Sequence, residues 1–466
     1  AARGFLDSAR GFLFETFARR RKIERQVSFE EGTASVRWPG SEDLVWRGGL
    51  VDASTGYSLE CSPAQQMALE LVKGAPLVQR ASTLRTALDS LRVSWEVGRV
   101  QFTVRRDNCF GDAISVLGNL PPDKWRQPFF VTFRGEPGLD AGGVSREFFF
   151  NAISELLDPA RGVFRVVEGS TYYPNDDFVV ERALGGKEDR VLTFAGRLLG
   201  KALLEGHHVP AGWNAVLLKH LMALPVSLRD DLCLLDAEIS RSLELIADMS
   251  GAQLTDLALT FSVARPTLNG FEDVSLRGDG GEEVTEGNVQ EFARLRATAD
   301  LGGQQAKSIG CLIRGFRDVV PEATLLLLET PEELREALAG VEALNVGEWR
   351  AATQLRGEFK DTPKHAVVEW YWSYVSSLGA AKKAELLKWA TGSARCPLGG
   401  FAKLHGRDGV LRPFTLTSVE LAQCAYPRAH TCFNRIDLPL FANQRDLVAA
   451  FDVALDPRQA QVFSMD

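Results

Sequence analysis

The residues of this chain whose types and spacing could do chemistry gather in one stretch near its end, AYPRAHTCFNRIDLP at 425–439. Cys432 lies there with His430 and Thr431 before it, the run FNR after it and a proline on each side of the group. Cationic and hydrogen-bonding groups beside a thiol stabilise the thiolate, which is the nucleophilic form of cysteine. The stretch therefore favours a reactive Cys432, with a buried structural thiol as the alternative.

Two kinds of cysteine chemistry fit such a stretch. A cysteine hydrolase needs a base and a third residue that orients the base. On an extended strand His430 points to the same side as Cys432, but no orienting residue is evident. A thiol that accepts and passes on an acyl group needs accessibility more than a dedicated base, because exchange between thiols of similar pKa is nearly balanced in energy. The residues thus indicate an acyl carrier that works through a thioester.

Composition and charge narrow the possible classes of protein. The 466 residues are 45% hydrophobic and 24% charged, which is typical of a globular protein with several domains. No apolar run approaches the roughly 20 residues of a membrane span, so no membrane partner is expected. A net charge of -8 argues against nucleic-acid binding.

The seven cysteines narrow the classes as well. They form no Cys-x-x-Cys pair and have no histidine at zinc spacing. We therefore expect no metal, no cofactor and no disulfide framework. A reducing compartment fits best, which means the cytoplasm, with the nucleus as the alternative.

A helix-rich α+β body is expected to position the cysteine. Short β-rich segments at 100–104 and 129–133 alternate with segments in which apolar residues recur every three or four positions. These intervals predict helices over 144–157, 191–204, 213–224, 232–246, 289–319 with a break near Gly302-Gly303, 363–378, 380–391 and 446–455. A further helix begins at the cap Thr330-Pro331 and stops at Gly340.

Residues 1–100 give weaker signals than the rest of the chain. In 1–25 the helical spacing of apolar residues predicts an amphipathic helix that docks on the main body. Residues 26–100 contain turn signals and a possible helix over 81–91, and no chemistry is evident there. The chain begins with Ala rather than Met, which leaves open that it is a piece of a longer protein.

Residues 354–360, QLRGEFK, lie between two of the predicted helical units. They are largely polar, with Gly357 at the centre. Because glycine accepts backbone conformations that other residues resist, this segment is predicted to be a hinge.

The cysteine stretch closely resembles the active-site motif of the HECT-type ubiquitin ligases, with AHTCFN at 429–434 followed by Leu438-Pro439. The resemblance continues in order over residues 101–466. It includes DAGGVSREFF at 140–149, FAGRLLGKAL at 194–203, Val284-Thr285 and Asn288 before a helix, TGS at 391–393 and PLGGF at 397–401. In that family a cysteine takes ubiquitin from a conjugating enzyme as a thioester and passes it to a substrate lysine.

The resemblance implies a bilobal α+β fold. An N-terminal extension over 1–100 would precede a large N-lobe over 101–353, which binds the conjugating enzyme. The hinge over 354–360 would then lead to a smaller C-lobe over 361–466 that carries Cys432. The implied partners are ubiquitin, a ubiquitin-conjugating enzyme and protein substrates.

The resemblance also implies site residues. Beside Cys432, the catalytic candidates are His430, Thr431, Asn434 and Phe463. Thr431 and Asn434 could hydrogen-bond the loop or a developing oxyanion, and His430 could polarise or deprotonate, with loop capping or packing as the alternative for each. The apolar groove for the conjugating enzyme is predicted at Leu243, Ile246, Leu257, Leu259 and Phe292, for which core packing is the alternative.

The signature glycines are interpreted as structural. Gly142-Gly143 would permit a tight entry to the following helix, and Gly196 and Gly200 would permit close helix packing. Two further functions stay open beside the ligase. One is a catalytically inactive HECT-like scaffold that only binds partners, and the other is a cysteine hydrolase that acts on ubiquitin conjugates.

Overall fold

The computed structural model describes residues 25–30, 32–38, 43–136, 143–210, 212–267, 270–404 and 411–455. The helix predicted over 1–25, apart from Arg25, lies outside these ranges, as do Gly142 and Phe463. The described chain combines many helices with small sheets, which agrees with the predicted α+β class.

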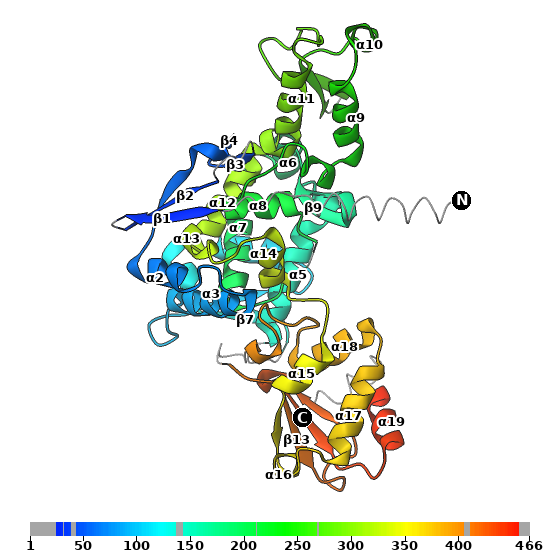
Figure 1. Ribbon diagram of the computed structural model, residues 1–466. Helices are drawn as coiled ribbons and strands as arrows, with labels where there is room; N and C mark the ends of the chain where they lie inside the picture. The colour runs from blue at the N-terminus through cyan, green and yellow to red at the C-terminus, as the bar shows by residue number, and fades with distance from the viewer. Residues whose placement is uncertain are drawn as a thin grey trace, which may run out of the picture.

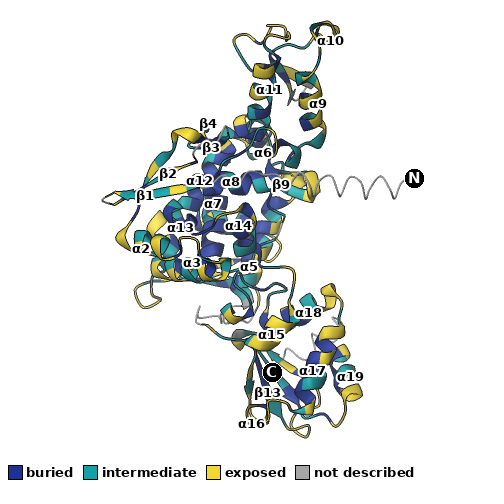
Figure 2. Cartoon of the chain, viewed as in Figure 1, coloured by how far each residue is buried: buried dark blue, intermediate teal, exposed yellow. Residues whose placement is uncertain are grey.

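Two separate hydrophobic cores organise the described residues. The larger core runs from Ala34 to Leu338 and the smaller core from Trp349 to Phe451. Figure 1 shows them as an upper body, coloured blue to yellow-green, and a lower body, coloured yellow to red. Figure 2 shows buried residues gathered inside each body. Because burial of apolar side chains is the main favourable term in folding, each body has its own source of stability.

Small sheets lie around the helices of the upper body. Strands β1, β2 and β5 form an antiparallel sheet, and the remaining strands pair as β3–β4, β6–β7, β8–β9 and β10–β11. The strands are β1 (Gln26–Glu30), β2 (Thr33–Arg37), β3 (Leu44–Trp46), β4 (Leu50–Asp52), β5 (Tyr57–Glu60), β6 (Val100–Val104), β7 (Phe129–Phe133), β8 (Phe164–Val167), β9 (Thr171–Pro174), β10 (Ser262–Thr267) and β11 (Gly270–Ser275). β6 and β7 have the bounds predicted from the sequence and pair in parallel.

Each α-helix predicted for the described residues of the upper body has a counterpart, but several others were not predicted, and the helix expected over 232–246 begins only at Ala237. The α-helices are α2 (Pro63–Leu71), α3 (Leu77–Leu91), α4 (Cys109–Leu117), α5 (Gly143–Leu157), α6 (Asp177–Leu184), α7 (Glu188–Glu205), α8 (Ala215–Met222), α9 (Ala237–Ala247), α10 (Gly251–Leu257), α11 (Val289–Thr298), α12 (Ala306–Val319), α13 (Glu322–Leu325) and α14 (Pro331–Ala339). Short turns join them: η1 (Ala53–Thr55), η2 (Pro122–Arg126), η3 (Pro159–Arg161), η4 (Glu168–Ser170), η5 (Leu232–Leu234) and η6 (Ala299–Gly303).

Helices α7 and α12 form the centre of the upper body, and glycines set how closely they approach. A Cβ atom on Gly196 would collide with the Leu312 carbonyl, and one on Gly200 would lie 2.9 Å from the Phe316 carbonyl oxygen. From the other helix, a Cβ on Gly315 would collide with the carbonyl of Thr193. The prediction that Gly196 and Gly200 permit close helix packing is therefore confirmed.

The long helical segment predicted over 289–319 breaks where the sequence indicated. Helix α11 ends at Thr298, a wide turn follows at η6, and α12 begins at Ala306. Gly302 has a φ of 148°, a backbone conformation that side chains other than glycine rarely allow. Beyond this break α9, α10, β10, β11 and α11 form a small projecting unit at the top of Figure 1.

The lower body is one mixed sheet with helices against one of its faces (Figure 1). The strand order is β12-β13-β15-β14, where β12–β13 and β13–β15 pair in parallel and β14–β15 pair antiparallel. Its elements are α15 (Val346–Ala352), β12 (Gln354–Arg356), α16 (Glu358–Asp361), α17 (Ala366–Ser377), α18 (Ala380–Thr391), η7 (Phe401–Lys403), β13 (Thr415–Val419), β14 (Arg428–His430), η8 (Thr431–Phe433), β15 (Arg435–Pro439) and α19 (Gln444–Ala454).

The predicted hinge over 354–360 lies inside the second core rather than between the cores. Its first three residues form β12, and Phe359 is fully buried. Gly357 has a φ of 66°, and a Cβ atom there would collide with the Ser418 hydroxyl, so close approach explains this glycine. The chain instead crosses from one core to the other between Leu338 and Val341, because Leu338 belongs to the larger core and Val341 already pairs with Cys396 of the smaller one. Whether the two bodies move relative to each other stays a prediction.

The predicted Thr330 cap of α14 is present and accepts from the Glu333 amide at 3.2 Å. Two other expectations differ from the structure in detail. Helix α17 begins at Ala366, three residues after the predicted start at Pro363, and His365 caps it. Residues 26–60, for which no regular pattern was evident, form strands β1–β5.

Candidate active site around Cys432

Cys432 lies in the turn that joins two antiparallel strands of the lower body. Strand β14 ends at His430, Thr431–Phe433 form the 3-10 turn η8, and β15 begins at Arg435, which is the register partner of His430. Because this segment is a tight turn, the extended geometry expected between His430 and Cys432 is wrong. The Cys432 side chain lies outside what the structure describes.

Asn434 closes the turn and is committed to holding it. Its φ of 49° lies in the left-handed region, which asparagine tolerates better than most residues. The side chain is 1% exposed, and its amide nitrogen donates to the Arg412 carbonyl at 2.8 Å. Its backbone carbonyl accepts from the Thr415 amide at 2.9 Å. These contacts support the loop-capping alternative for Asn434 over direct contact with an oxyanion.

His430 is held by a carboxylate from the neighbouring strand. Its Nε2 lies 2.8 Å from Asp437 Oδ2, and Arg435 Nε lies 3.0 Å from the other oxygen of the same carboxylate. The three side chains are 37%, 30% and 19% exposed for His430, Arg435 and Asp437. With Nε2 facing a carboxylate, the hydrogen on that nitrogen is fixed and Nδ1 is left as the second polar atom of the ring.

Helix α18 supports the turn from beneath, since it packs against both η8 and β14. Its last residue, Thr391, accepts a hydrogen bond at its carbonyl from Arg146 of the upper body. His208 and Ser393 add a second contact between the bodies, with 2.7 Å from Nδ1 to Oγ. Two of the motifs singled out in the sequence, at 140–149 and 391–393, therefore touch across the boundary between the cores.

Most of the other cysteines are buried, and burial changes the pKa of their thiols. Burial raises the pKa of Cys61, and raises the pKa of Cys109 and of Cys311 to about 12. Burial also raises the pKa of Cys396 strongly. A raised thiol pKa lowers the thiolate fraction, so these four thiols are poor nucleophiles. Cys233 is half-buried in η5.

The five residues predicted to bind the conjugating enzyme gather in the small projecting unit. Leu243 and Phe292 are buried in its core, and Ile246 and Leu259 are half-buried against that core. Leu257, at the end of α10, is 46% exposed. Of the five, it has the largest apolar surface available to a partner.

Some candidate residues had no signal strong enough to be found in the sequence. Leu245 and Phe271 are exposed on the projecting unit, 60% and 77% respectively, and were not predicted. Asp437 has no distinguishing signal in the sequence, because its contact with His430 depends on the register of β14 with β15. The Arg146–Thr391 contact joins segments far apart in the chain, so spacing gave no indication of it.

Within the described ranges, no cluster of three or more His, Cys, Asp or Glu side chains is arranged to hold a metal ion. Over the same residues, no helix combines the length and apolar character needed to cross a membrane.

Comparison with known proteins supplies the family. Residues 150–465 match the model of the HECT domain, described as a ubiquitin-transferase domain. The chain is 32% identical to E3 ubiquitin-protein ligase HECW2 of Homo sapiens over 348 residues, which cover 73% of this chain and 21% of that protein. It is 29% identical to E3 ubiquitin-protein ligase RSP5 of Saccharomyces cerevisiae over 364 residues, 77% of this chain and 43% of that protein. The chain therefore spans less than half of either relative.

Proposed function

The chain belongs to the HECT ubiquitin-transferase family, and we propose that it is an active ubiquitin ligase that carries ubiquitin as a thioester on Cys432. One observation carries the proposal. The AHTCFN motif forms the tip of the β14–β15 hairpin, and the turn is braced by Asn434 below and by the His430–Asp437 contact beside it. A short turn between strands is a position from which a thiol can be offered to a large acyl donor.

The proposed reaction has two acyl transfers. In the first, the Cys432 thiolate attacks the carbonyl carbon of ubiquitin on the conjugating enzyme, a new C–S bond forms, and the sulfur of the conjugating enzyme leaves as a thiolate. In the second, a neutral lysine amine attacks the same carbon, a C–N bond forms, and Cys432 leaves as a thiolate while the amine loses a proton to a base. Cationic neighbours such as Arg435 favour the thiolate in both steps.

We assign proton handling to His430, which lies two residues before Cys432 at the end of β14. Asp437 acts through it as a positioning residue, because the 2.8 Å contact fixes the ring and leaves Nδ1 as its other polar atom. The contact also occupies the Asp437 carboxylate, together with Arg435, so Asp437 is a poor candidate for the direct lysine base.

The conjugating enzyme is proposed to dock on the small projecting unit of the upper body. Leu257 is exposed there, and Leu245 and Phe271 add apolar surface on the same unit. Exposed apolar groups that gather on one unit are typical of a docking site. The transferred ubiquitin would then pass to the lower body. Any rearrangement between the bodies falls between Leu338 and Val341, because Val341 and 354–360 are already part of the second core.

A non-reducing gel tests the proposed function. The protein is incubated with ubiquitin, activating enzyme, conjugating enzyme and ATP, and we expect a shifted band that collapses on adding a thiol. Cys432→Ala should abolish this band, Cys432→Ser should give a band that resists thiol, and Cys233→Ala should keep it. A thiol-sensitive band in Cys432→Ala would contradict the assignment.

The same experiment separates the alternatives. An inactive scaffold would bind the conjugating enzyme without forming any shifted band. A hydrolase would cleave ubiquitin conjugates in the absence of ATP.

The docking site has its own test. Leu257→Asp should slow formation of the thioester by roughly 30-fold if Leu257 is a central contact, since such residues contribute about 2 kcal/mol or more. Val166→Asp is the matched control, because Val166 is also about half exposed on the upper body. Equal charging rates in the two variants would place the docking site elsewhere.

A further inference from the structure

The outer face of the sheet in the lower body is unusually cationic. Strand register places Arg356, Thr417, Asp437 and Arg428 in one row across the four strands. The next row on the same face is Gln354, Thr415, Arg435 and His430. We call Arg356, Arg428, His430 and Arg435, with Asp437 among them, the cationic face.

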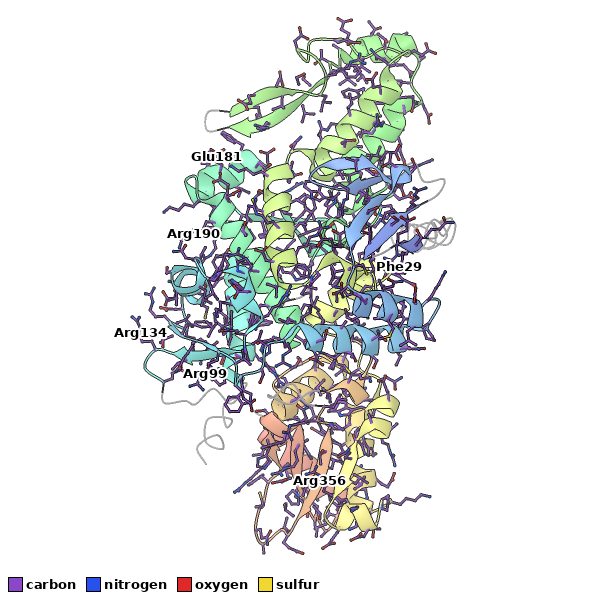
Figure 3. All side chains as sticks on the ribbon, turned by 90° about the vertical axis from the view of Figure 1, so that its left-hand side faces the viewer. Phe29, Arg99, Arg134, Glu181, Arg190 and Arg356 are labelled. Carbon is purple, nitrogen blue, oxygen red and sulfur yellow. The ribbon has the colours of Figure 1, made fainter. Side chains whose placement is uncertain are left out.

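The opposite face of the sheet is apolar and covered. Leu355 packs against the second core, and Leu416, Ile436 and Leu438 are fully buried within it, on the side where the helices lie. Because side chains alternate between the faces of a strand, the two rows lie on the other face of the sheet. Arg356 and Arg428 are exposed at its two edges, whereas Thr415 between them is buried. Figure 3 looks onto the side of the molecule at the left of Figure 1 and shows Arg356 on this sheet.

The carboxylate of this face is already occupied. Asp437 contacts His430 at 2.8 Å and Arg435 at 3.0 Å, so both of its oxygens already have a partner. Arg356 and Arg428 are exposed, and neither forms an ion pair with another residue in the described ranges. With three arginines against one aspartate, the face carries a surplus of positive charge on a chain whose net charge is -8.

The cationic face lies directly beside the cysteine turn. His430 is both the last residue of β14 and a member of the face, and Cys432 follows two residues later in η8. A partner segment lying along the face would therefore pass close to Cys432. This position suits the molecule that receives ubiquitin, because its lysine must reach the thioester.

We propose that the cationic face binds an acidic segment next to the acceptor lysine of the substrate, and so selects which lysines receive ubiquitin. This inference rests on the proposed function. Arg356 and Arg428 supply the free positive charges, and aspartate or glutamate side chains of the acceptor supply the complement. Charge complementarity of this kind contributes to orientation and specificity more than to raw affinity.

The test is single-turnover discharge of the preformed Cys432 thioester to two synthetic peptides. Each peptide contains one lysine, flanked by aspartates in one and by serines in the other. The measured quantity is the ratio of the two discharge rates. The wild-type protein should prefer the acidic peptide by roughly 2- to 20-fold, as expected for two exposed charge pairs. The preference should decrease as added salt shortens the screening length.

Charge-reversal variants locate the preference. Arg356→Glu/Arg428→Glu should lose or invert the ratio. The matched control is Lys382→Glu/Arg445→Glu, which makes the same change in net charge on exposed positions of α18 and α19 and should keep the wild-type ratio. The single variant Arg356→Gln should reduce the ratio by an intermediate amount, which guards against misfolding of the double variant.

The possible outcomes distinguish a failure of this inference from a failure of the proposed ligase function. Equal rates on the two peptides in the wild type, or an unchanged ratio in Arg356→Glu/Arg428→Glu, would overturn the inference. Slower thioester formation in that variant, with the ratio kept, would assign the face to ubiquitin or the conjugating enzyme and also overturn it. A wild-type protein that forms no thioester at all would remove the proposed function itself.

Discussion

Two clusters of the same kinds of side chain, one in each body, differ in how far they are buried. In the upper body Lys201 is fully buried, lies 2.6 Å from Glu205 Oε1 and donates to the Gln127 carbonyl. His207 contacts the other Glu205 oxygen at 3.2 Å. In the lower body His430, Asp437 and Arg435 make a comparable group at the surface beside Cys432. Burial therefore separates a cluster that holds the fold from one that is available for chemistry.

The protonation of the buried cluster reflects its surroundings. Burial alone would raise the pKa of Glu205, but Lys201 and His207 hold it at about 2. Burial lowers the pKa of Lys201 and of His207, which the facing Glu205 partly offsets. The charges are mutually dependent, because each would be costly to bury without the others.

The largest expected effect breaks the buried cluster. Lys201→Met leaves Glu205 buried without its main cation and should lower the free energy of unfolding by about 3–5 kcal/mol. The matched control is Arg350→Met, which breaks the ion pair with Glu369, where both side chains are nearly half exposed, and should cost less than about 1 kcal/mol. Urea denaturation of the two variants measures the difference, and similar losses would show that burial is not what separates the clusters.

The second effect concerns the exposed cluster. Asp437→Asn should slow discharge of the thioester to free lysine by about tenfold, or about 1.4 kcal/mol, because His430 loses the carboxylate that orients it. The unfolding free energy should change by less than about 1 kcal/mol, as for other exposed ion pairs. Asp361→Asn, at an exposed position of α16, is the control. Wild-type discharge in Asp437→Asn would contradict the positioning role.

A third effect depends on pH and belongs to the upper body. Burial, reinforced by Arg146, lowers the pKa of His208 to about 3, and burial lowers the pKa of His220 to about 4. An unfolded histidine titrates near 6.5, so below that pH the unfolded chain binds protons that the folded chain does not. Stability should be full above about pH 6.5 and should fall as the pH decreases toward 4.

Melting curves between pH 7.5 and 4.5 measure this loss. In His220→Gln the dependence on pH should be shallower than in the wild type. A melting temperature that rises on acidification would contradict the burial of these two histidines.

The smallest expected effect is a difference in the rate of alkylation among the cysteine thiols. Cys109 and Cys311, with pKa values raised to about 12 by burial, should resist alkylation by iodoacetamide at pH 8. Peptide mapping by mass spectrometry should find Cys432 modified before either of them. Modification of Cys109 or Cys311 at an equal rate would remove the distinction on which the reactive assignment of Cys432 depends.

Sequence patterns predicted those features of the fold that depend on residues close together in the chain. The break near Gly302 and the close approach at Gly196 and Gly200 follow from properties of glycine, so they were found. The bounds of β6, β7 and α18 also agree with the periodic patterns. The strands of 26–60 were missed because they are short and pair within small sheets, where alternation is weak.

The candidate site was predicted in its residues but not in its geometry. The contact between His430 and Asp437 depends on the pairing of β14 with β15, which spacing alone does not give. The hinge was placed at Gly357 because glycine permits rotation, whereas the structure uses this glycine for close approach to Ser418. A glycine pattern does not distinguish these two uses, because both require the absence of a side chain.

The parallel pairing of β12 has a consequence during synthesis of the chain. Gln354 of β12 is synthesised well before its partner Thr415 of β13, and Thr415 before its partner Arg435 of β15. The sheet can therefore form only after β15 has left the ribosome. The upper core is complete by Leu338, so it can fold while the rest is still being translated. During translation the upper body, with its proposed docking unit, would therefore be folded before the sheet that holds the Cys432 turn can form.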